Sequence, residues 1–355
     1  MKSGWVTKKL GEVCEIIHGR NQSSVADENG KYPIYGSGGV MGWATDFRCP
    51  AGCTIVGRKG SINNPIFVSE KFWNVDTAYA LSPIDIEAKW LFYFCRSFDF
   101  AQLDCGTTIP SLTSALVKDI DIPIPPLEEQ KRIVAKIDAA FEKIDKLKAN
   151  AEKNLANAKE LFQSALDEAM RPKKGWVEKR LPEISENLDS KRVPITKAKR
   201  EHGIIPYYGA SGIVDYVRDY LFDGRYLLVS EDGANLESRT YPIAFSISGK
   251  TWVNNHAHIL RFDDEPVQAY VELYLNSISL KHYITGAAQP KLTQENLNKI
   301  FIAIPSERAE IVKVVNLLKE LRAKIKLLEQ NYSQQIADCA EMRQAVLREA
   351  FEGRL

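Results

Sequence analysis

The sequence predicts an α+β protein in which two tandem mixed α/β domains are joined by two long antiparallel helices. These helices would form a coiled-coil rod with internal pseudo-two-fold symmetry. Three observations predict this fold class. The chain repeats itself once, and each repeat begins with a stretch rich in glycine, proline and aromatic residues. Each repeat then ends in a long stretch whose apolar residues lie three or four positions apart.

Length and composition are those of an ordinary folded chain. Its 355 residues suffice for two domains, and 45% hydrophobic with 26% charged residues excludes wholesale disorder. The sequence has no apolar run of about 18 residues and no apolar core of a signal peptide, so we expect a cytoplasmic protein without a membrane span. The six cysteines should then be free thiols. A net charge of +1 argues against non-specific coating of nucleic acid but allows local basic faces.

Internal duplication is the most informative feature of the chain. Five segments return in the same order, and only the lengths of the loops between them differ. The matched pairs are residues 4–10 with 175–181, 33–40 with 206–213, 55–60 with 228–233, 110–113 with 290–293, and 120–125 with 300–305. The period is far too long for a solenoid, so one domain-sized unit is used twice.

Each copy opens with a globular part, which we place at residues 1–126 and 173–305. Residues 120–124 and 300–304 alternate apolar with other residues and are followed by proline, which predicts strands. Short helices are expected at 87–100 and 267–280. The rest predicts a mixed domain with substantial β content.

Each copy closes with a long helix, which we place at residues 127–172 and 306–355. Residues 128–171 contain no glycine or proline, and their basic and acidic side chains balance, 9 against 9. A helix of about 45 residues is about 65 Å long and outruns a domain about 35 Å wide. The two helices should therefore pair with each other, rather than each packing on its own domain. The predicted seams include Ile137, Ile144, Leu147 and Ala151 in the first helix, and Val314, Leu328 and Met342 in the second.

No sequence motif predicts catalysis. The glycine-rich residues 35–39 are followed by a poor helix start, which favours a tight turn with positive φ over a nucleotide loop. Residues 64–67 resemble part of an amino-group methyltransferase motif but lack its second proline. His256 and His258 would share one strand face; because no third ligand is evident, surface histidines are favoured over a metal pair. We therefore predict a non-enzyme without catalytic residues and without a metal site.

Binding fits the pattern better, and DNA is a natural ligand for two similar domains at a fixed spacing. Residues 173–200 hold nine basic and four acidic side chains. Arg192, Lys197, Lys199 and Arg200 are predicted to form a loop suited to phosphate contact. The alternative is an ordinary solvated surface loop.

One matched loop reverses its charge between the copies. The first copy has Arg58 and Lys59 where the second has Glu231 and Asp232, and a glycine follows in both. Arginine and lysine suit the acceptors of guanine, whereas glutamate and aspartate suit the amino group of cytosine. The hypothesis is that this loop reads bases and that the two half-sites differ.

The chain resembles the specificity (S) subunit of type I restriction–modification systems over its whole length. The segments that carry the resemblance are residues 35–39, 57–61, 109–112, 122–130 and 347–355. The second copy departs from the pattern at residues 304–307, which lack the Pro-Pro-Leu-x-Glu-Gln form.

The resemblance implies a non-catalytic subunit with two target recognition domains. Each domain would read one half of an interrupted DNA target, and the helices would set the spacing between the halves. It implies double-stranded DNA, two methyltransferase (M) subunits and restriction (R) subunits as partners. S-adenosylmethionine, ATP and Mg are expected only on those partner subunits. Two alternatives stay open: a specificity subunit that serves a fused methylase–nuclease, and a rod-linked binder of protein or glycan.

The candidate DNA-binding residues follow from the turns and charged loops of each copy. In the first domain they are Arg20, Tyr35, Ser37, Arg58, Lys59 and Thr108. In the second domain they are Lys199, Tyr208, Ser211, Glu231, Asp232, Arg239 and Lys291.

Overall fold

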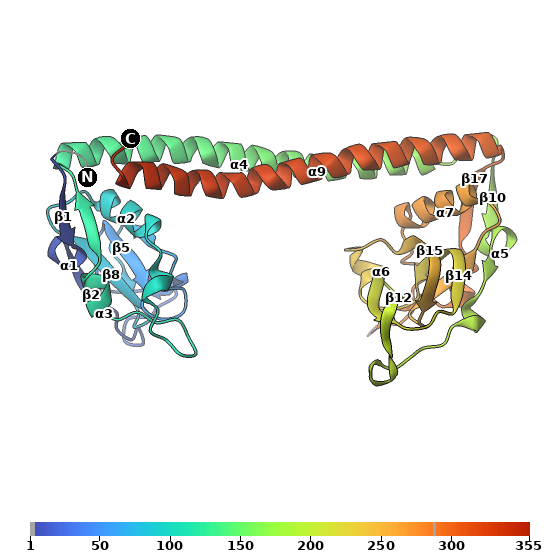
Figure 1. Ribbon diagram of the computed structural model, residues 1–355, viewed down its shortest axis with the longest axis horizontal. Coiled ribbons are helices and arrows are strands. Elements are labelled where there is room, and N and C mark those ends of the chain that lie inside the picture. Colours follow the sequence, from blue (N-terminus) through green and yellow to red (C-terminus); the bar gives the residue numbers. More distant parts are fainter. Residues whose placement is uncertain (1–3, 287–288) are drawn as a thin grey trace. The chain divides into compact units, whose positions relative to one another are not determined.

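The computed structural model describes residues 4–286 and 289–355. The chain divides into two compact units (Figure 1). Unit 1 contains the residues up to Glu152 together with Ser333–Leu355, and unit 2 contains Lys153–Tyr332. Each unit therefore combines one globular domain with a part of both long helices.

The first domain contains two small sheets and a separate strand pair. Strand β1 (Val6–Lys9) pairs antiparallel with β9 (Asp121–Ile124). One sheet has the order β2-β8-β5-β6 and the other the order β4-β3-β7. The strands are β2 (Cys14–His18), β3 (Tyr32–Gly36), β4 (Gly39–Ala44), β5 (Cys53–Gly57), β6 (Ile66–Val68), β7 (Trp73–Asn74) and β8 (Ala78–Pro83). The helices are α1 (Leu10–Val13), α2 (Ala88–Ser97), η1 (Phe100–Leu103) and α3 (Ser114–Lys118).

The second domain repeats this plan with one larger sheet. Strand β10 (Trp176–Arg180) pairs antiparallel with β17 (Phe301–Pro305), and the other strands follow the order β11-β16-β14-β15-β12-β13. They are β11 (Glu186–Asn187), β12 (His202–Gly209), β13 (Gly212–Val217), β14 (Phe222–Ser230), β15 (Ala244–Val253) and β16 (Ala257–Arg261). The helices are α5 (Leu181–Ile184), η2 (Asp189–Lys191), η3 (Lys197–Lys199), α6 (Asn235–Ser238), α7 (Glu265–Ser277) and α8 (Gln294–Leu297).

The sheets differ because β15 is continuous. Its ten residues pair with β14 along most of their length and also with β12, so a single sheet forms. In the first domain the chain leaves the strand conformation between β6 and β7, and two sheets result.

The predicted duplication extends to single hydrogen bonds. In the first domain the Trp90 indole on α2 donates to the carbonyl of Pro123 at 3.0 Å. In the second, the Tyr270 hydroxyl on α7 donates to the carbonyl of Ala303 at 2.7 Å. Pro123 and Ala303 lie in β9 and β17, the strands predicted from residues 120–124 and 300–304. The predicted helices at 87–100 and 267–280 are α2 and α7.

Two helices of 44 residues each, α4 (Leu127–Met170) and α9 (Arg308–Phe351), are the long helices predicted from the sequence. Helix α4 follows Pro126 and ends two residues before Pro172, as proline requires. In unit 1 the start of α4 packs on the end of α9, with Ile133, Ile137, Leu347 and Ala350 in one cluster. In unit 2 the end of α4 packs on the start of α9. The Arg322 guanidinium of α9 lies over the Phe162 ring of α4 there. Within each unit, then, the helices are antiparallel.

The seam differs from the prediction at three residues. Leu147, Leu328 and Met342 were predicted to be buried, but they are 53%, 38% and 44% exposed. A helix of 3.6 residues per turn drifts away from a strict heptad, so a position near the margin of the stripe turns outward. Ile144 and Ala151 lie on the buried side as predicted.

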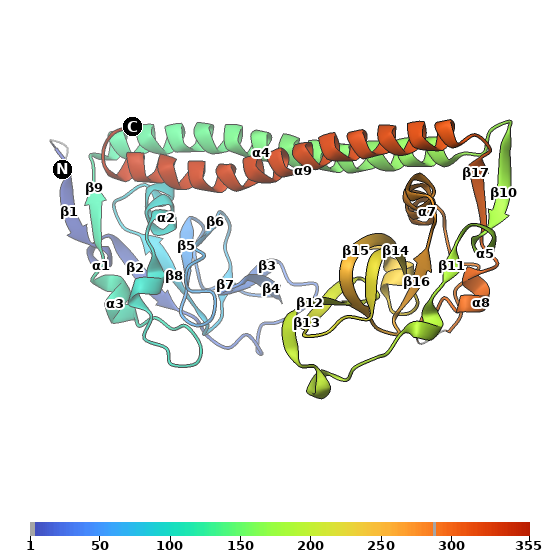
Figure 2. The same ribbon diagram turned by 45° about the vertical axis from the view of Figure 1, so that its right-hand side comes forward.

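The ends of the long helices also belong to the cores of the domains. Helix α2 lies between the four-stranded sheet and the long helices (Figure 1), and its Trp90 and Leu91 share a core with Ile133. Helix α7 takes the corresponding place in unit 2 (Figure 2). The alternative that each helix packs on its own domain is thus correct for the start of each helix, whereas the end of each helix packs on the domain of the other copy.

The thiols are free, as predicted: five of the six cysteines are buried, Cys105 is exposed, and none forms a disulfide in the described residues. Among those residues no helix has the length and apolar character that a membrane span needs.

Candidate nucleic-acid interface

Three loops meet in the first domain, and backbone hydrogen bonds join two of them. We call them the hairpin turn (residues 36–39), the charged loop (residues 57–60) and the proline loop (residues 110–113). The Gly60 amide donates to the Pro110 carbonyl at 2.9 Å, and the Leu112 amide donates to the Arg58 carbonyl at 2.9 Å. The hydroxyl oxygen of Ser37 in the hairpin turn lies beside Gly60.

The second domain builds the same arrangement from residues 209–212, 230–233 and 290–293. The Gly233 amide donates to the Pro290 carbonyl at 3.1 Å, and the Leu292 amide donates to the Glu231 carbonyl at 2.7 Å. The Ser230 hydroxyl donates to the carbonyl of Ala210 in the hairpin turn at 2.5 Å. The backbone framework is thus equal in both domains, while the side chains on it differ.

The hairpin turns have the conformation predicted from their glycines. Gly39 has a φ of 121° and Gly212 a φ of 127°, in the region that favours glycine. Both turns join antiparallel strands with the same pairing, Gly36 with Gly39 and Gly209 with Gly212. No helix follows either turn, so the nucleotide-loop alternative is excluded by the local geometry.

The two hairpin tyrosines lie next to these turns and are partly buried. Burial raises the pKa of Tyr35, and the nearby charge of Glu70 adds a smaller effect in the same direction. Burial likewise raises the pKa of Tyr208, and Tyr216 adds a smaller effect. Both hydroxyls therefore stay protonated at neutral pH and can donate a hydrogen bond.

The two basic side chains of the charged loop in the first domain have no carboxylate partner among the described residues. Arg58 donates from Nη1 to the carbonyl of Asp76 at 2.9 Å, and Lys59 is exposed. Neither forms an ion pair with any of the described residues. Arg58 and Lys59 therefore make the charged loop of this domain positive.

Two further candidates of the first domain lie around these loops. Thr108 is exposed in a loop whose base is held by Asp104, since the Asp104 carboxylate accepts from the amides of Gly106 and Ser111, both at 2.8 Å. These hydrogen bonds lower the pKa of Asp104, and the bond from the Ser111 amide has the largest effect. Arg20 is exposed, and its amide donates to the carbonyl of Asn74 at 3.0 Å, beside the pairing of Asn74 with Tyr35.

Of the candidates in the second domain, three reach solvent. Ser211 is exposed at the hairpin turn, Lys199 is exposed in η3, and the Lys291 side chain is 49% exposed. Lys291 also forms an ion pair with Glu231 at 3.3 Å. Their proposed contacts with DNA stay predictions.

Three charged side chains have internal partners that the sequence did not predict. Arg192 was expected in a basic surface loop, but its side chain is 11% exposed and contacts Glu231 at 2.7 Å. The Glu231 carboxylate is only 12% exposed and lies between Arg192 and Lys291. Arg239 donates to the carbonyls of Leu275, Asn276 and Ile278 at the end of α7. These donors stabilise a helix end, whereas the contact of Arg239 with DNA stays a prediction.

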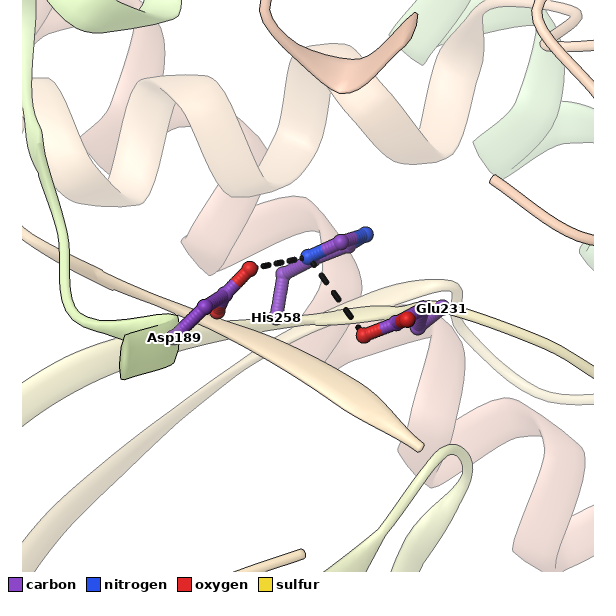
Figure 3. A group of neighbouring side chains, drawn as sticks. All are labelled: Asp189, Glu231 and His258. Atoms are coloured by element: carbon purple, nitrogen blue, oxygen red, sulfur yellow. Dashed lines mark hydrogen bonds and ion pairs between the residues drawn. The ribbon is translucent and has the colours of Figure 1, made fainter. Parts of the chain in front are cut away.

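A buried charged cluster of the second domain was not predicted from the sequence. Asp189, Glu231 and His258 lie together, as Figure 3 shows, and His258 is 1% exposed. The prediction that His258 is a surface histidine was wrong, because its strand β16 lies between β11 and β14 and η2 contacts β16. His256 precedes this strand, is 49% exposed, and contacts Asp232 at 2.9 Å. The signal that could have indicated burial is the apolar sequence around His258 in β16, Ala257–Arg261.

Comparison with known proteins gives the family. The model for the type I restriction modification DNA specificity domain matches residues 2–156 and again residues 173–337. The chain belongs to this family. The two matches repeat the internal duplication, with one specificity domain in each copy.

Named relatives agree with this assignment. The chain is 36% identical over 146 residues to S.HindORF215P of Haemophilus influenzae, which is named as a type I restriction enzyme specificity subunit. It is 24% identical over 168 residues to the EcoDI specificity subunit of Escherichia coli. These matches cover 40% and 47% of this chain, but only 37% and 38% of the lengths of those relatives. The MjaIX specificity subunit of Methanocaldococcus jannaschii is 22% identical, with 99% of this chain and 86% of that protein covered.

Solved structures share the fold. A chain from a study of complex assembly and conformational transition of the type I R-M system has a TM-score of 0.80 at 20% identity, with 100% and 99% of the two chains covered. The HsdS subunit from Thermoanaerobacter tengcongensis has a TM-score of 0.61 at 19% identity, with 100% and 98% covered. Two tandem specificity domains with long helices are therefore the fold of this chain.

Proposed function

We propose that the chain is the DNA sequence-recognition subunit of a type I restriction–modification complex. Each specificity domain reads one half of a bipartite, interrupted target. The observation that supports this most directly is the repeated set of three loops, whose backbone hydrogen bonds are equal and whose charged side chains differ. A constant framework with variable side chains is what reading two different half-sites requires.

The first domain offers the simpler interface. Arg58 and Lys59 stand on a loop held by backbone hydrogen bonds, with no carboxylate partner among the described residues. The Ser37 hydroxyl lies beside Gly60 of this loop, and Thr108 is exposed. Arginine and lysine in the major groove bind the acceptors of guanine, and the same charges attract phosphate. In the second domain Lys199, Ser211 and Lys291 are the accessible candidates.

The long helices are proposed to set the spacing of the half-sites and to dock two methyltransferase subunits. Their outward faces carry apolar side chains that the seams do not use. Leu147 and Leu161 on α4 are 53% and 55% exposed, and Leu317 and Leu327 on α9 are 60% and 58% exposed. Exposed leucines on a long helix fit a protein partner better than they fit solvent or DNA.

The proposed subunit acts in the cytoplasm and is not itself an enzyme. In the complex, S-adenosylmethionine, ATP and Mg belong to the methyltransferase and restriction subunits. What this chain supplies is recognition, spacing and docking.

Mapping of modified bases in the host genome, with and without this gene, tests the proposal. We expect an interrupted motif with a modified base in each half, which disappears when the gene is deleted. A methylation pattern that does not change on deletion would contradict the proposal. Mapping of a strain in which only residues 1–126 are replaced should show a change in one half-motif. A partner that carries methylase and nuclease in one chain would identify the fused type of system.

A further inference from the structure

His258 makes two short contacts at opposite sides of its ring. Its Nε2 lies 2.7 Å from the carbonyl oxygen of Leu292 in the proline loop. Its Nδ1 lies 2.6 Å from Oδ2 of Asp189 and 3.7 Å from Oε2 of Glu231 (Figure 3). The ring is 1% exposed, so no water competes for these contacts.

The partners of this ring define its charge. A carbonyl oxygen only accepts, so Nε2 must carry a proton. Asp189 already accepts at Oδ1 from the backbone amide of Ile259 at 2.9 Å. At Oδ2 it accepts from the side-chain amide of Asn187 at 3.2 Å. Burial acts to raise the pKa of Asp189, but the hydrogen bond and charge of His258, the Ile259 amide and Arg192 together hold it below its usual range. An ionised carboxylate only accepts, so Nδ1 must carry a proton as well.

The first domain provides an internal comparison. Tyr79 pairs with Val56 as His258 pairs with Val229, and 55–60 and 228–233 are matched segments. The Tyr79 hydroxyl donates to the carbonyl of Leu112, the counterpart of Leu292, at 3.3 Å. A neutral phenol thus holds the proline loop in one domain, and a charged imidazolium holds it in the other.

The charge of the charged loop differs according to the ring that lies next to it. Glu231 stands near the imidazolium of His258, while Arg58 takes the corresponding place in the domain with Tyr79. A positive side chain in place of Glu231 would face a buried positive ring. The charge reversal between the loops therefore reflects the residue beneath each loop, in addition to any base that the loops contact.

A metal ion is the competing explanation of this cluster. Asp189, Glu231 and His258 offer ligand atoms within 4.8 Å of one another. The Arg192 guanidinium, however, lies 2.7 Å from the Glu231 carboxylate and 3.4 Å from the Asp189 carboxylate. It also donates to the carbonyl of Ala257 at 2.6 Å. The chain supplies its own cation at this position.

We infer that His258 is a positioning residue, held as an imidazolium, on which recognition by the second specificity domain depends. It fixes the proline loop through Leu292 and fixes Glu231 by charge. Glu231 in turn forms the ion pair that orients Lys291, whose side chain is half-exposed. The effect on DNA recognition rests on the proposed function, whereas the charge of the ring does not.

The charged groups that face His258 come from three segments. Asp189 and Arg192 come from η2 and the residue after it, Glu231 from the loop after β14, and Lys291 from the proline loop. Replacement of the ring by a neutral side chain would remove the hydrogen bond to Asp189 and leave the carboxylates of Asp189 and Glu231 with one positive neighbour fewer. Recognition by the second domain should then weaken, while the first domain, which has Tyr79 at this place, should be unchanged.

The charge of the ring is tested by nitrogen NMR of the full chain with labelled histidine, assigned with His258→Gln. We expect two protonated ring nitrogens for His258 at about pH 7. A single protonated nitrogen would overturn the inference. Addition of Zn²⁺ should leave both protons in place, and their loss on binding Zn²⁺ would support the metal explanation instead.

The effect on recognition is tested with the full chain and its methyltransferase subunits. The assay measures methylation of duplexes in which one half-site at a time is altered. We expect His258→Gln, which keeps a donor for Leu292 but no charge, to reduce discrimination at the second half-site by about tenfold and to leave the first unchanged. Tyr79→Phe is the matched control and should affect only the first half-site.

The outcomes separate the two proposals. If the wild type shows no dependence on either half-site, the proposed function fails, and the NMR result still decides the charge of the ring. If His258→Gln does not fold, Glu231→Gln replaces it, because this variant keeps the backbone hydrogen bonds of the charged loop and removes the charge that faces the ring. Unchanged discrimination at the second half-site by the folded variant would overturn the inference.

Discussion

Gln130 accepts a hydrogen bond from the backbone amide of Glu87 at 2.9 Å and donates to the carbonyl of Pro125 at 2.8 Å. The side chain is 1% exposed. Glu87 is the residue before α2, so one buried amide ties the start of the long helix α4 to the start of α2. In unit 2 the corresponding junction is an ion pair, in which Arg308 donates to the carboxylate of Asp264 before α7 at 2.8 and 3.0 Å.

Replacement of Gln130 by alanine should destabilise unit 1. The change leaves the Glu87 amide and the Pro125 carbonyl without partners in a buried place, which costs about 2–3 kcal/mol of unfolding free energy. Arg308→Ala is the matched control, and because its ion pair is largely exposed it should cost clearly less unfolding free energy than Gln130→Ala. Urea denaturation of the two variants measures both values. Equal losses would show that the buried amide has no special part in the junction.

Exchange of the charged loop should change one half-site. The double substitution Arg58→Glu with Lys59→Asp replaces donors for guanine by acceptors for the cytosine amino group. We expect a different preferred base in one half of the target, with the original half-site weakened by about tenfold to a hundredfold. Sequencing of methylated products from a randomised duplex gives the preference. A uniform loss of affinity for all sequences would assign this loop to phosphate contact.

Arg239 should matter for folding and not for recognition. Its guanidinium donates to three carbonyls at the end of α7, and burial lowers its pKa. Arg239→Ala should reduce the unfolding free energy by about 1–3 kcal/mol through those unpaired carbonyls. Half-site preference, measured with folded protein below the melting temperature, should stay that of the wild type. A changed preference would return Arg239 to the recognition set.

Lys199 should act through salt-dependent contact with phosphate. It is exposed in η3 and has no ion pair within the described part of the chain. Lys199→Ala should weaken binding to every sequence alike and reduce the slope of log affinity against log salt by about 1. Arg200→Ala is the comparison, because Arg200 already pairs with Asp215 at 3.0 Å. A slope that is the same in the wild type and in Lys199→Ala would exclude a phosphate contact at this position.

Asp189 should make unit 2 sensitive to acid. Its folded pKa lies below the ordinary value of 3.8, because His258, the Ile259 amide and Arg192 outweigh the effect of burial. Such a group stabilises the fold above that ordinary value, and the contribution is lost as the pH falls through the folded pKa. Asp189→Asn should therefore cost about 3 kcal/mol near neutral pH, and the difference from the wild type should shrink below about pH 4. A difference that is independent of pH would mean that packing alone explains the loss.

The sequence predicted the repeat, the long helices and the turns because these follow from local patterns. The strand of residues 300–304 and the glycine turn at residues 209–212 need only their neighbours to be recognised. The outward rotation of Leu147 could not be predicted, because it depends on small departures from the heptad. The partners of Glu231 could not be predicted either, since Arg192 lies 39 residues away in the chain and reaches it only through the fold.

The charged loop and the proline loop of each domain are joined through backbone amides and carbonyls, and the identity of a side chain hardly affects such bonds. A substitution at residue 58 or 59 can therefore alter the surface while these two loops stay joined. A chain built in this way could acquire a new recognition surface by the exchange of a few exposed side chains.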